Sequence, residues 1–487
     1  MANELRQDER ESYEEQPREA NEMLQGVLAM APSWLGSAII HIVVILLLAQ
    51  VPWQISPQED KVWQADIVNK VDDVKKEELP PEKPVVEDPD ADLSDLPPAD
   101  VAYVPEVEME QTEMDVPGFN VLEPEKDPPL AIAKLALGDQ GASGHFHGIY
   151  GSRGGRGRRA SSMRYGGNPL AEKGVMDALG WLARVQESDG RWDSVKWGAN
   201  HNCDAGLTGL ALLAFLGHGD TDRDEGKYRL TVAKALEWLE KRGGGNGSFG
   251  ERFYTQGICT MAVSEAYGMT KNPRWASLAQ KALDFLCANQ NANGGWDYGG
   301  NNPGRVDTSV TGWCVMALKS GVASGLNVPE ASIVAIKKWI TESVNADGTT
   351  GYTKNIGAQG STGGTPPMTS VATLARQFMG WKRDSEELQK GLDYIAKAGP
   401  SVGANANLYY TYYGTLVMFQ AQGEYWMNWN KAFRDPLIDR QVKNRGPQLD
   451  GSWDTDDTYG AHGGRVYTTA MAVFCLEVYY RFMPIFK

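Results

Sequence analysis

The stretches QESDGRW (residues 186–192), QNANGGW (290–296) and QLDGSW (448–453) decide the fold, because each is one copy of a recurring turn. Related turns are GNGSF (245–249), NADGTTGY (345–352) and a degraded PSVGANAN (400–407). The aromatic residues of these turns recur at intervals of roughly 50 residues or twice that, a period typical of a repeat built from two helices. The C-terminal part of this 487-residue chain therefore consists of six copies of one unit.

Each turn joins two helices of different character. The segments ahead of the turns, such as LGWLARVQ, LEWLEKR and LDFLCANQ, carry one apolar stripe. The segments after them are apolar nearly all round, as in GLTGLALLAFLG, SVTGWCVMALKSG and TTAMAVFCLEVYY, which is typical of helices buried on both sides. An inner ring of buried helices inside an outer ring of amphipathic ones satisfies both patterns. We therefore predict an all-α (α/α)6 toroid of six helix hairpins over residues 168–487.

The Q-x-x-x-G-x-W pattern at 186–192 and 290–296, shortened at 448–453, resembles the QW repeat of squalene–hopene cyclases and protein prenyltransferase β subunits. In that family the glycine lets the turn reverse, while Gln and Trp tie one helix end to the next unit. The resemblance implies the toroid fold, and it raises the question of terpenoid or prenyl chemistry.

Residues 454–458, DTDDT, match the Asp-x-Asp-Asp-Thr motif with which class II terpene cyclases protonate their substrate. The motif follows Trp453 directly and precedes the inner helix expected near Val466, whereas in the cyclases it caps an inner helix. Asp456 and Asp457 are therefore weak candidates for catalytic acids. An exposed acidic turn is the favoured interpretation, and Asp454, Asp456 and Asp457 are the residues of it that could hold Ca²⁺.

Prenyltransferase β subunits bind Zn²⁺ through an Asp-x-Cys pair and a later histidine. The nearest match here is His201 and Cys203, with His462 as the distant ligand, which makes a weak zinc site. Because neither the cyclase set nor the zinc set is complete, we predict no resident cofactor and assign no reaction.

The starts of the inner helices should line the centre of the toroid. They supply the candidate binding residues Asp204, Asp307, Trp313, Tyr409, Tyr412 and Tyr467. Tyrosines suit a large ligand or a peptide. The same aromatic residues are equally consistent with simple filling of the core.

The N-terminal part contains WLGSAIIHIVVILLLAQV, an uncharged run within residues 34–53. At 1.5 Å per residue it forms about 27 Å of helix, enough to cross a bilayer core. Trp34 and Trp53 flank it, as interfacial tryptophans do. The run is longer than the core of a usual signal peptide and starts late in the chain, so we predict an uncleaved transmembrane helix after a cytoplasmic acidic tail at residues 1–33.

Ser37 and His41 lie four residues apart and so share one face of that helix. A histidine inside a membrane needs a partner or water, unless it lies near enough to one end to reach the interface. A single span with Ser-x-x-x-His, followed by an acidic Pro-rich tether, resembles TonB-type energy transducers. The resemblance implies contact with proton-channel subunits of the ExbB/ExbD kind, and it places the protein in a bacterial inner membrane with its C-terminal domain in the periplasm.

The formal net charge of −16 does not belong to the repeat domain, because residues 52–150 alone hold 7 Lys/Arg against 23 Asp/Glu. Residues 54–137 are predicted to be a disordered, acidic, Pro-rich tether. Residues 138–167 are rich in Gly and Arg and form either a flexible hinge, which we favour, or a patch for anionic lipid or RNA. The remaining domain is about neutral, so nucleic acid is not an expected partner. Five cysteines without a CxxC pair are predicted to be buried thiols.

Together these patterns predict a membrane-anchored periplasmic binding module that couples through its span to a proton channel and binds an unknown periplasmic ligand. The alternative is an isoprenoid-handling enzyme, either a cyclase or a metal-dependent transferase.

Overall fold

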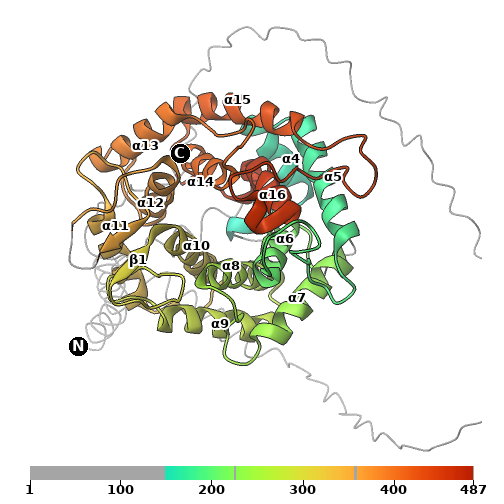
Figure 1. Ribbon diagram of the computed structural model, residues 1–487, viewed down its shortest axis with the longest axis horizontal. Helices are drawn as coiled ribbons and strands as arrows, with labels where there is room; N and C mark the ends of the chain where they lie inside the picture. The colour runs from blue at the N-terminus through green and yellow to red at the C-terminus, as the bar shows by residue number, and fades with distance from the viewer. Residues whose placement is uncertain (1–147, 224–225, 356–358, 486–487) are drawn as a thin grey trace, which may run out of the picture. The chain divides into compact units, whose positions relative to one another are not determined.

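Two concentric rings of helices make up the repeat domain (Figure 1). The computed structural model describes residues 148–223, 226–355 and 359–485. The outer helices are α5 (Pro169–Val185), α7 (Arg229–Gly243), α9 (Pro273–Ala288), α11 (Glu330–Ser343), α13 (Glu386–Ala398) and α15 (Gly423–Asp439). The inner helices are α6 (Asp204–His218), α8 (Phe253–Thr270), α10 (Thr308–Ala323), α12 (Pro366–Phe378), α14 (Leu408–Ala421) and α16 (Gly460–Leu476). The chain alternates between the rings, as predicted for a helical toroid.

A small antiparallel ribbon is the one departure from helices among the described residues. It pairs β1 (Arg305–Asp307) with β2 (Thr353–Asn355), with Val306 opposite Lys354. The ribbon joins the loops that precede α10 and α12.

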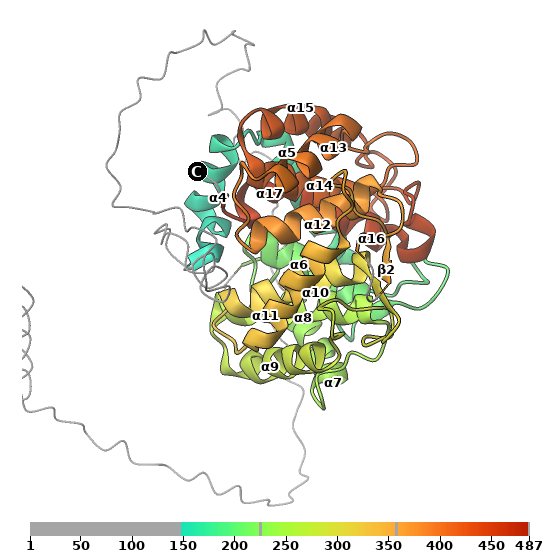
Figure 2. The same ribbon diagram turned by 90° about the vertical axis from the view of Figure 1, so that its left-hand side faces the viewer.

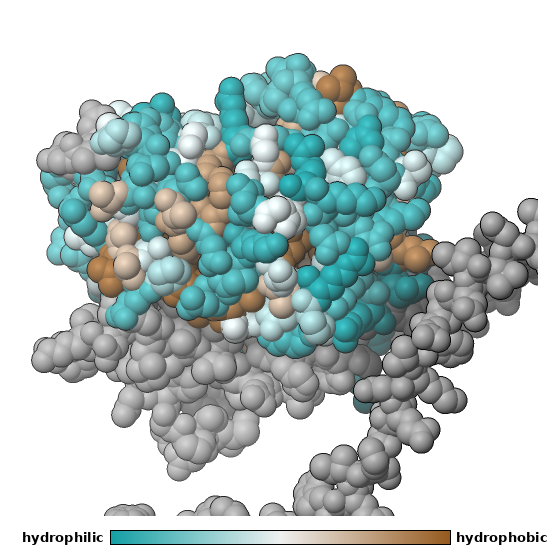
Figure 3. All heavy atoms as spheres, turned by 90° about the horizontal axis from the view of Figure 1, so that it is seen from below, coloured by the Kyte–Doolittle hydropathy of each residue, from teal (hydrophilic) through white to brown (hydrophobic). Residues whose placement is uncertain are grey.

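Burial explains which helices form which ring. Every residue of α6 and α14 is buried, so these helices contact protein on all sides. In contrast, α13 buries one stripe at helical spacing, made of Leu388, Gly391, Leu392 and Ile395. Figure 3 shows hydrophilic side chains over most of one outer face, with small apolar patches between them.

A glycine at each well-formed turn lets the turn touch the next outer helix. Gly294 has a φ of 87°, and a Cβ there would lie 1.7 Å from the carbonyl oxygen of Ala335 in α11. Only glycine adopts this conformation without strain and leaves room for that contact. The same approach recurs at Gly190 against Lys234, Gly247 against Lys281, Gly348 against Lys390 and Gly451 against Asp177.

Hydrogen bonds from Gln and Trp fix the same turns. Trp192 Nε1 donates to the carbonyl oxygen of Leu182 at 2.9 Å, which holds the turn against its own helix. Gln186 Nε2 donates to Gly190 O in the turn and to Thr231 O in the next outer helix. Gln290 and Trp296 repeat this arrangement. The role predicted for the motif is therefore confirmed in both units.

The last unit closes the ring with a different glutamine from the one expected. The sequence pattern predicts Gln448, but Gln441 Nε2 donates to Gly174 O in α5 and to Gly451 O in the turn. Gln441 takes this role because it lies just after the end of α15, as Gln186 lies after the end of α5. Gln448 contributes only its carbonyl oxygen, which accepts from Trp181 Nε1 at 2.9 Å.

The turn of the fourth unit also differs from the prediction. The sequence pattern predicts Tyr352 as the turn residue, but Thr350 occupies that place. In the first unit the backbone N–H of Trp192 donates to Thr208 Oγ1. In the fourth unit the equivalent hydrogen bond runs from the backbone N–H of Thr350 to Thr369 Oγ1. Tyr352 lies two residues later, just before β2, and its side chain is 36% exposed. It is therefore free to take part in a surface.

Buried ion pairs seal the end of the toroid where the inner helices terminate. Arg153, at the end of η2 (Gly148–Arg153), contacts Glu265 at 2.7 Å, and Arg481 in α17 (Val478–Arg481) pairs with Glu265 and Glu477. All four side chains are fully buried. Because a buried charge is costly without its partner, these contacts hold η2 and α17 firmly in place.

Of the segment predicted to be a hinge, residues 148–167 belong to the fold, whereas residues 138–147 lie outside the described residues. η2 and α4 (Gly155–Arg164) are helical and pack on α17. They lie at one end of the toroid, and β2 lies at the opposite end (Figure 2). The predicted transmembrane helix at 34–53, with Ser37 and His41, and the tether at 54–137 lie outside the described residues. Within the described ranges, no helix is both long and apolar enough to span a bilayer.

The turn contact gives a direct stability test. Replacing Gly294 by Ala should lower the free energy of unfolding by about 2–5 kcal/mol, because a Cβ clashes with Ala335 O and the positive φ becomes strained. Gly403 is the matched control, since a Cβ there meets nothing within 4 Å and its φ is not positive. Gly403→Ala should change stability by less than about 0.5 kcal/mol in urea unfolding. Equal losses would show that the turn contact is not what holds the units together.

A second test uses His218 at the end of α6. Its Nδ1 lies 2.8 Å from Asp220 and its Nε2 3.6 Å from Glu172. Burial opposes protonation, but these carboxylates outweigh it and raise the pKa of His218 to about 9. Because the pKa of His218 is higher in the folded than in the unfolded protein, protonation of His218 stabilises the fold. This stabilisation is complete at pH values below the unfolded pKa of about 6.5, and it is lost as the pH rises through 9.

His218→Gln should therefore destabilise the protein at pH 6 by about 3 kcal/mol more than at pH 9.5, as measured by urea unfolding across this range. A difference between the two proteins that stays constant with pH would contradict the assignment.

Candidate functional site

The inner helices run parallel, so their N-terminal ends and the loops that precede them gather at one end of the toroid. We call this the loop end; its described residues are 186–203, 244–252, 289–307, 344–355, 359–365, 399–407 and 440–459. It lies opposite the buried ion pairs. All the candidate binding residues predicted from the sequence lie at this end or just below it.

Two of those candidates, Asp204 and Asp307, are engaged in the local structure. Asp204 accepts hydrogen bonds from the Ser194 backbone and hydroxyl and pairs with Arg191 at 3.1 Å. Burial raises its pKa, but these contacts outweigh burial and lower it. Asp307 caps α10 through the N–H groups of residues 309 and 310 and pairs with Arg305 at 3.1 Å. Both carboxylates thus shape the loop end rather than stand free in it.

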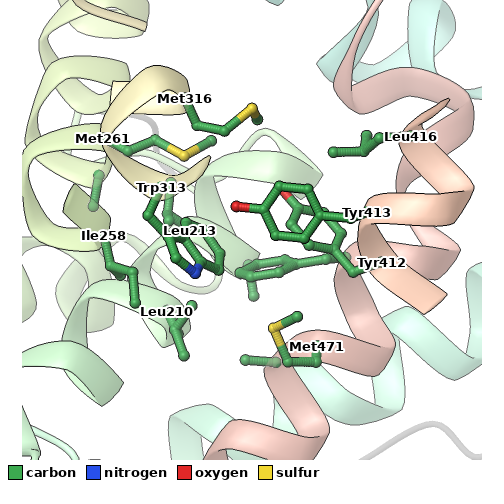
Figure 4. Close-up of a cluster of buried hydrophobic side chains, with 14 of the residues drawn as sticks. Leu210, Leu213, Ile258, Met261, Trp313, Met316, Tyr412, Tyr413, Leu416 and Met471 are labelled. Carbon is green, nitrogen blue, oxygen red and sulfur yellow. The ribbon is translucent and has the colours of Figure 1, made fainter. Parts of the chain in front are cut away.

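An aromatic core fills the centre of the toroid below the loop end. It consists of Trp313 on α10 and Tyr409, Tyr412 and Tyr413 on α14, all at most 2% exposed. Trp313 stacks on Tyr412 at 5.8 Å and meets Tyr413 edge-on at 5.9 Å, as Figure 4 shows. Residues that were candidates for cavity lining therefore pack on one another across the ring.

Two buried hydroxyl groups of this centre, those of Tyr412 and Tyr467, have no partner among the described residues. Burial raises the pKa of both tyrosines, so each phenol keeps its proton. Buried polar groups are nearly always paired in proteins, so these two donors point to a polar guest or water.

An aromatic surface continues from this core to the solvent. We define it as Tyr254, Tyr298, Tyr352, Tyr459 and His462. Its rings form a continuous series with Tyr409 of the core: Tyr298 lies 6.4 Å from Tyr254, Tyr254 6.4 Å from Tyr409, Tyr409 6.1 Å from Tyr459, and Tyr459 6.4 Å from His462. The hydroxyl groups of Tyr352 and Tyr459 lie 2.6 Å apart.

Exposure separates the aromatic surface from the core. Tyr298 and Tyr352 are each 36% exposed, Tyr254 and Tyr459 are half-buried, and His462 is exposed. Sequence reasoning missed Tyr298 and Tyr459, which lie in loops, and treated Tyr352 as a turn residue. The signal for Tyr298 was its place two residues after the buried turn residue Trp296.

The acidic motif at 454–458 does not form a free acidic site. Asp454 pairs with Arg445 and Arg465, and Asp456 is exposed and pairs with Arg440 at 2.6 Å. Asp457 accepts the backbone N–H of Leu408 at 2.7 Å and that of Tyr459 at 2.8 Å. Burial raises the pKa of Asp457 despite these hydrogen bonds. The motif thus braces the start of α14, and it presents no free set of oxygens for Ca²⁺.

The candidate zinc ligands are neighbours without forming a ligand set. The rings of His201 and His462 lie 6.2 Å apart, and Cys203 Sγ donates to the backbone carbonyl of His462. Burial raises the pKa of the Cys203 thiol to about 11, which disfavours the thiolate that binds zinc. In the part of the chain that the structure describes, no group of three or more His, Cys, Asp or Glu side chains could hold a metal.

Of the comparisons with known proteins, only the one with solved structures finds similar proteins. No protein-family model and no curated protein matches the sequence. The α-1,6-mannanase GH76A of Salegentibacter sp. HEL1_6 aligns at 12% identity and a TM-score of 0.47, covering 64% of this chain and 99% of the mannanase. The unsaturated glucuronyl hydrolase of Bacillus sp. GL1 aligns at 16% identity and a TM-score of 0.48, covering 64% of this chain and 96% of the hydrolase. Cellobiose 2-epimerase of Spirochaeta thermophila DSM 6192 aligns at 12% identity and a TM-score of 0.49, covering 66% of this chain and 96% of the epimerase.

These structures are (α/α)6 toroids, and they are carbohydrate enzymes rather than terpene cyclases. The function predicted from the sequence is therefore wrong, both as a terpene-cyclase-like binding module coupled through a TonB-like span and as an isoprenoid-handling enzyme. The QW pattern misled because its glycine, Gln and Trp build a helix–turn–helix contact and perform no chemistry. At these identities and TM-scores the likeness concerns the fold alone. The predicted inner-membrane location of residues 34–53 is not tested and stays a prediction.

The different structural roles of Asp456 and Asp457 can be tested by their effects on stability. Asp457→Ala should lower the free energy of unfolding by about 1–3 kcal/mol, because two backbone N–H groups lose their acceptor. Asp456→Ala should cost less than about 1 kcal/mol, since it removes one exposed ion pair. Urea unfolding of the two variants provides the comparison, and a larger loss for Asp456→Ala would refute this assignment.

Proposed function

We propose that the loop end of the toroid is a carbohydrate-recognition surface. The observation that carries the proposal is a series of aromatic rings that runs from Tyr298 through Tyr254, the buried Tyr409 and Tyr459 to His462, all partly or fully exposed except Tyr409. A sugar presents flat C–H faces rimmed by hydroxyl groups. Tyrosine offers a flat apolar ring with a polar tip, so it matches both features.

The unpartnered donors below the aromatic surface support the same ligand class. The Tyr412 and Tyr467 hydroxyl groups lack acceptors among the described residues. Ligand sites typically combine aromatic walls with a few polar groups that fix orientation. Sugar hydroxyl groups reaching inward, directly or through water, would satisfy such donors.

The acidic groups favour binding over hydrolysis. Glycoside hydrolysis generally requires two carboxyl groups that flank the scissile bond, one to protonate the leaving oxygen and one to act as base or nucleophile. At the loop end, Asp204, Asp307 and Asp456 each pair with an arginine, and Asp457 accepts two backbone N–H groups. The fold itself is compatible with many activities and does not decide the matter.

Two tyrosines at opposite ends of α8 test the proposal. Tyr254 belongs to the aromatic surface, whereas the half-buried Tyr267 lies near the other end of the same helix. The full-length protein should bind a member of a panel of neutral and acidic oligosaccharides in isothermal titration calorimetry. Tyr254→Ala should weaken that binding at least tenfold, about 1.4 kcal/mol, and Tyr267→Ala should leave it unchanged.

Product analysis of the same mixtures should show the oligosaccharide intact. Failure of every oligosaccharide to bind, or equal affinities of the two variants, would refute carbohydrate recognition. Cleaved or epimerised products would refute the non-hydrolytic part of the proposal and direct attention to Asp457.

A further inference from the structure

A buried arginine without a carboxylate partner lies in a pocket that the aromatic surface does not line. Arg376, near the end of α12, is 3% exposed. Its Nη1 donates to the backbone carbonyl of Glu387 at 3.2 Å, and its Nε has no acceptor. Among the described residues, no carboxylate oxygen lies within 4.0 Å of this guanidinium group, although Glu387 is close enough to favour its charge.

The other buried arginines show how unusual this is. Arg153 and Arg481 are fully buried, and both pair with Glu265. A buried charge that lacks a partner is strongly unfavourable, so proteins rarely keep one without a use for it. Burial lowers the pKa of Arg376 to about 10, which still leaves the group charged at neutral pH.

The guanidinium lines a pocket formed by the end of α11, the loop that follows it and the start of α13. Both helices lie on the side of the toroid that faces the viewer in Figure 2. The pocket has a volume of about 280 Å³. Its lining includes Trp381, the apolar Val344 and Ala346, and the charged Glu387 and Lys390. Lys390 already pairs with Glu386 at 2.8 Å. Glu387 favours the charge of Arg376 from a distance, but among the described residues no carboxylate contacts the guanidinium, so Arg376 is the cation of this pocket that lacks a direct anionic partner.

We propose that this pocket binds a small organic carboxylate, which supplies the anion that Arg376 lacks. Arginine presents a planar fork of donors that matches the two oxygens of a carboxylate. The tryptophan wall and the aliphatic side chains suit a flat apolar body attached to that carboxylate. The pocket is separate from the aromatic surface, so it constitutes a second ligand site.

The test compares two probes of one shape, benzoate and the neutral benzamide, on the full-length protein. Benzoate should raise the thermal unfolding midpoint in proportion to the logarithm of its concentration and give a saturable calorimetric signal, whereas benzamide should do neither. Sodium sulfate serves as the inorganic anion, and a shift with sulfate but not benzoate would overturn the carboxylate assignment.

Arg376→Met should abolish the benzoate effect while leaving the unliganded midpoint equal to or above that of the wild type, because it removes an uncompensated buried charge. Arg274→Gln, which removes an exposed arginine paired with Glu237 and Glu240, is the control and should keep the full effect. If Arg376→Met fails to fold, Arg376→Lys should fold and bind benzoate at least tenfold more weakly.

Two results would overturn the proposal. One is an equal benzoate effect in the wild type and in either Arg376 variant. The other is a wild type that shows no response to benzoate up to its solubility limit.

Discussion

The contact between a turn glycine and the backbone of the next outer helix sets the geometry of the toroid. At Gly294 this contact leaves no room for even one methyl group. Because the same contact recurs around the ring, successive units are held at a similar spacing and orientation. The contact of Gly451 with Asp177 in α5 makes the last interface equivalent to the others, so the repeat closes into a ring instead of continuing as an open superhelix.

Ring closure with parallel inner helices gives the toroid two chemically different ends. One end is sealed by fully buried ion pairs between Arg153, Glu265 and Arg481, which also fix the segment through which the chain enters the domain. The other end gathers every loop that precedes an inner helix, and there the aromatic rings reach the solvent. A ligand therefore has access to the loop end, where side chains of several units meet.

The fold by itself does not decide the chemistry. A QW-like turn and an aspartate-rich motif suggested terpenoid chemistry, yet both have structural roles: Gln186 and Trp192 tie helices together, and Asp457 braces the start of α14. Function has to be argued from groups that lack a structural use. Two such features are the partly exposed rings around Tyr254 and the guanidinium of Arg376, which has no carboxylate partner among the described residues.

The sequence alone determined the helical toroid, because hydrophobic periodicity and turn chemistry are local and repeat along the chain. It also indicated that Trp313 and Tyr412 belong to the centre, since both lie on helices that are apolar all round. It did not show that Gln441 rather than Gln448 closes the ring, or that Tyr352 joins Tyr459 at the loop end. Those relations link residues far apart in the chain, and only the packing of complete helices determines which of them meet. Whether a charged side chain has a partner is likewise a tertiary property.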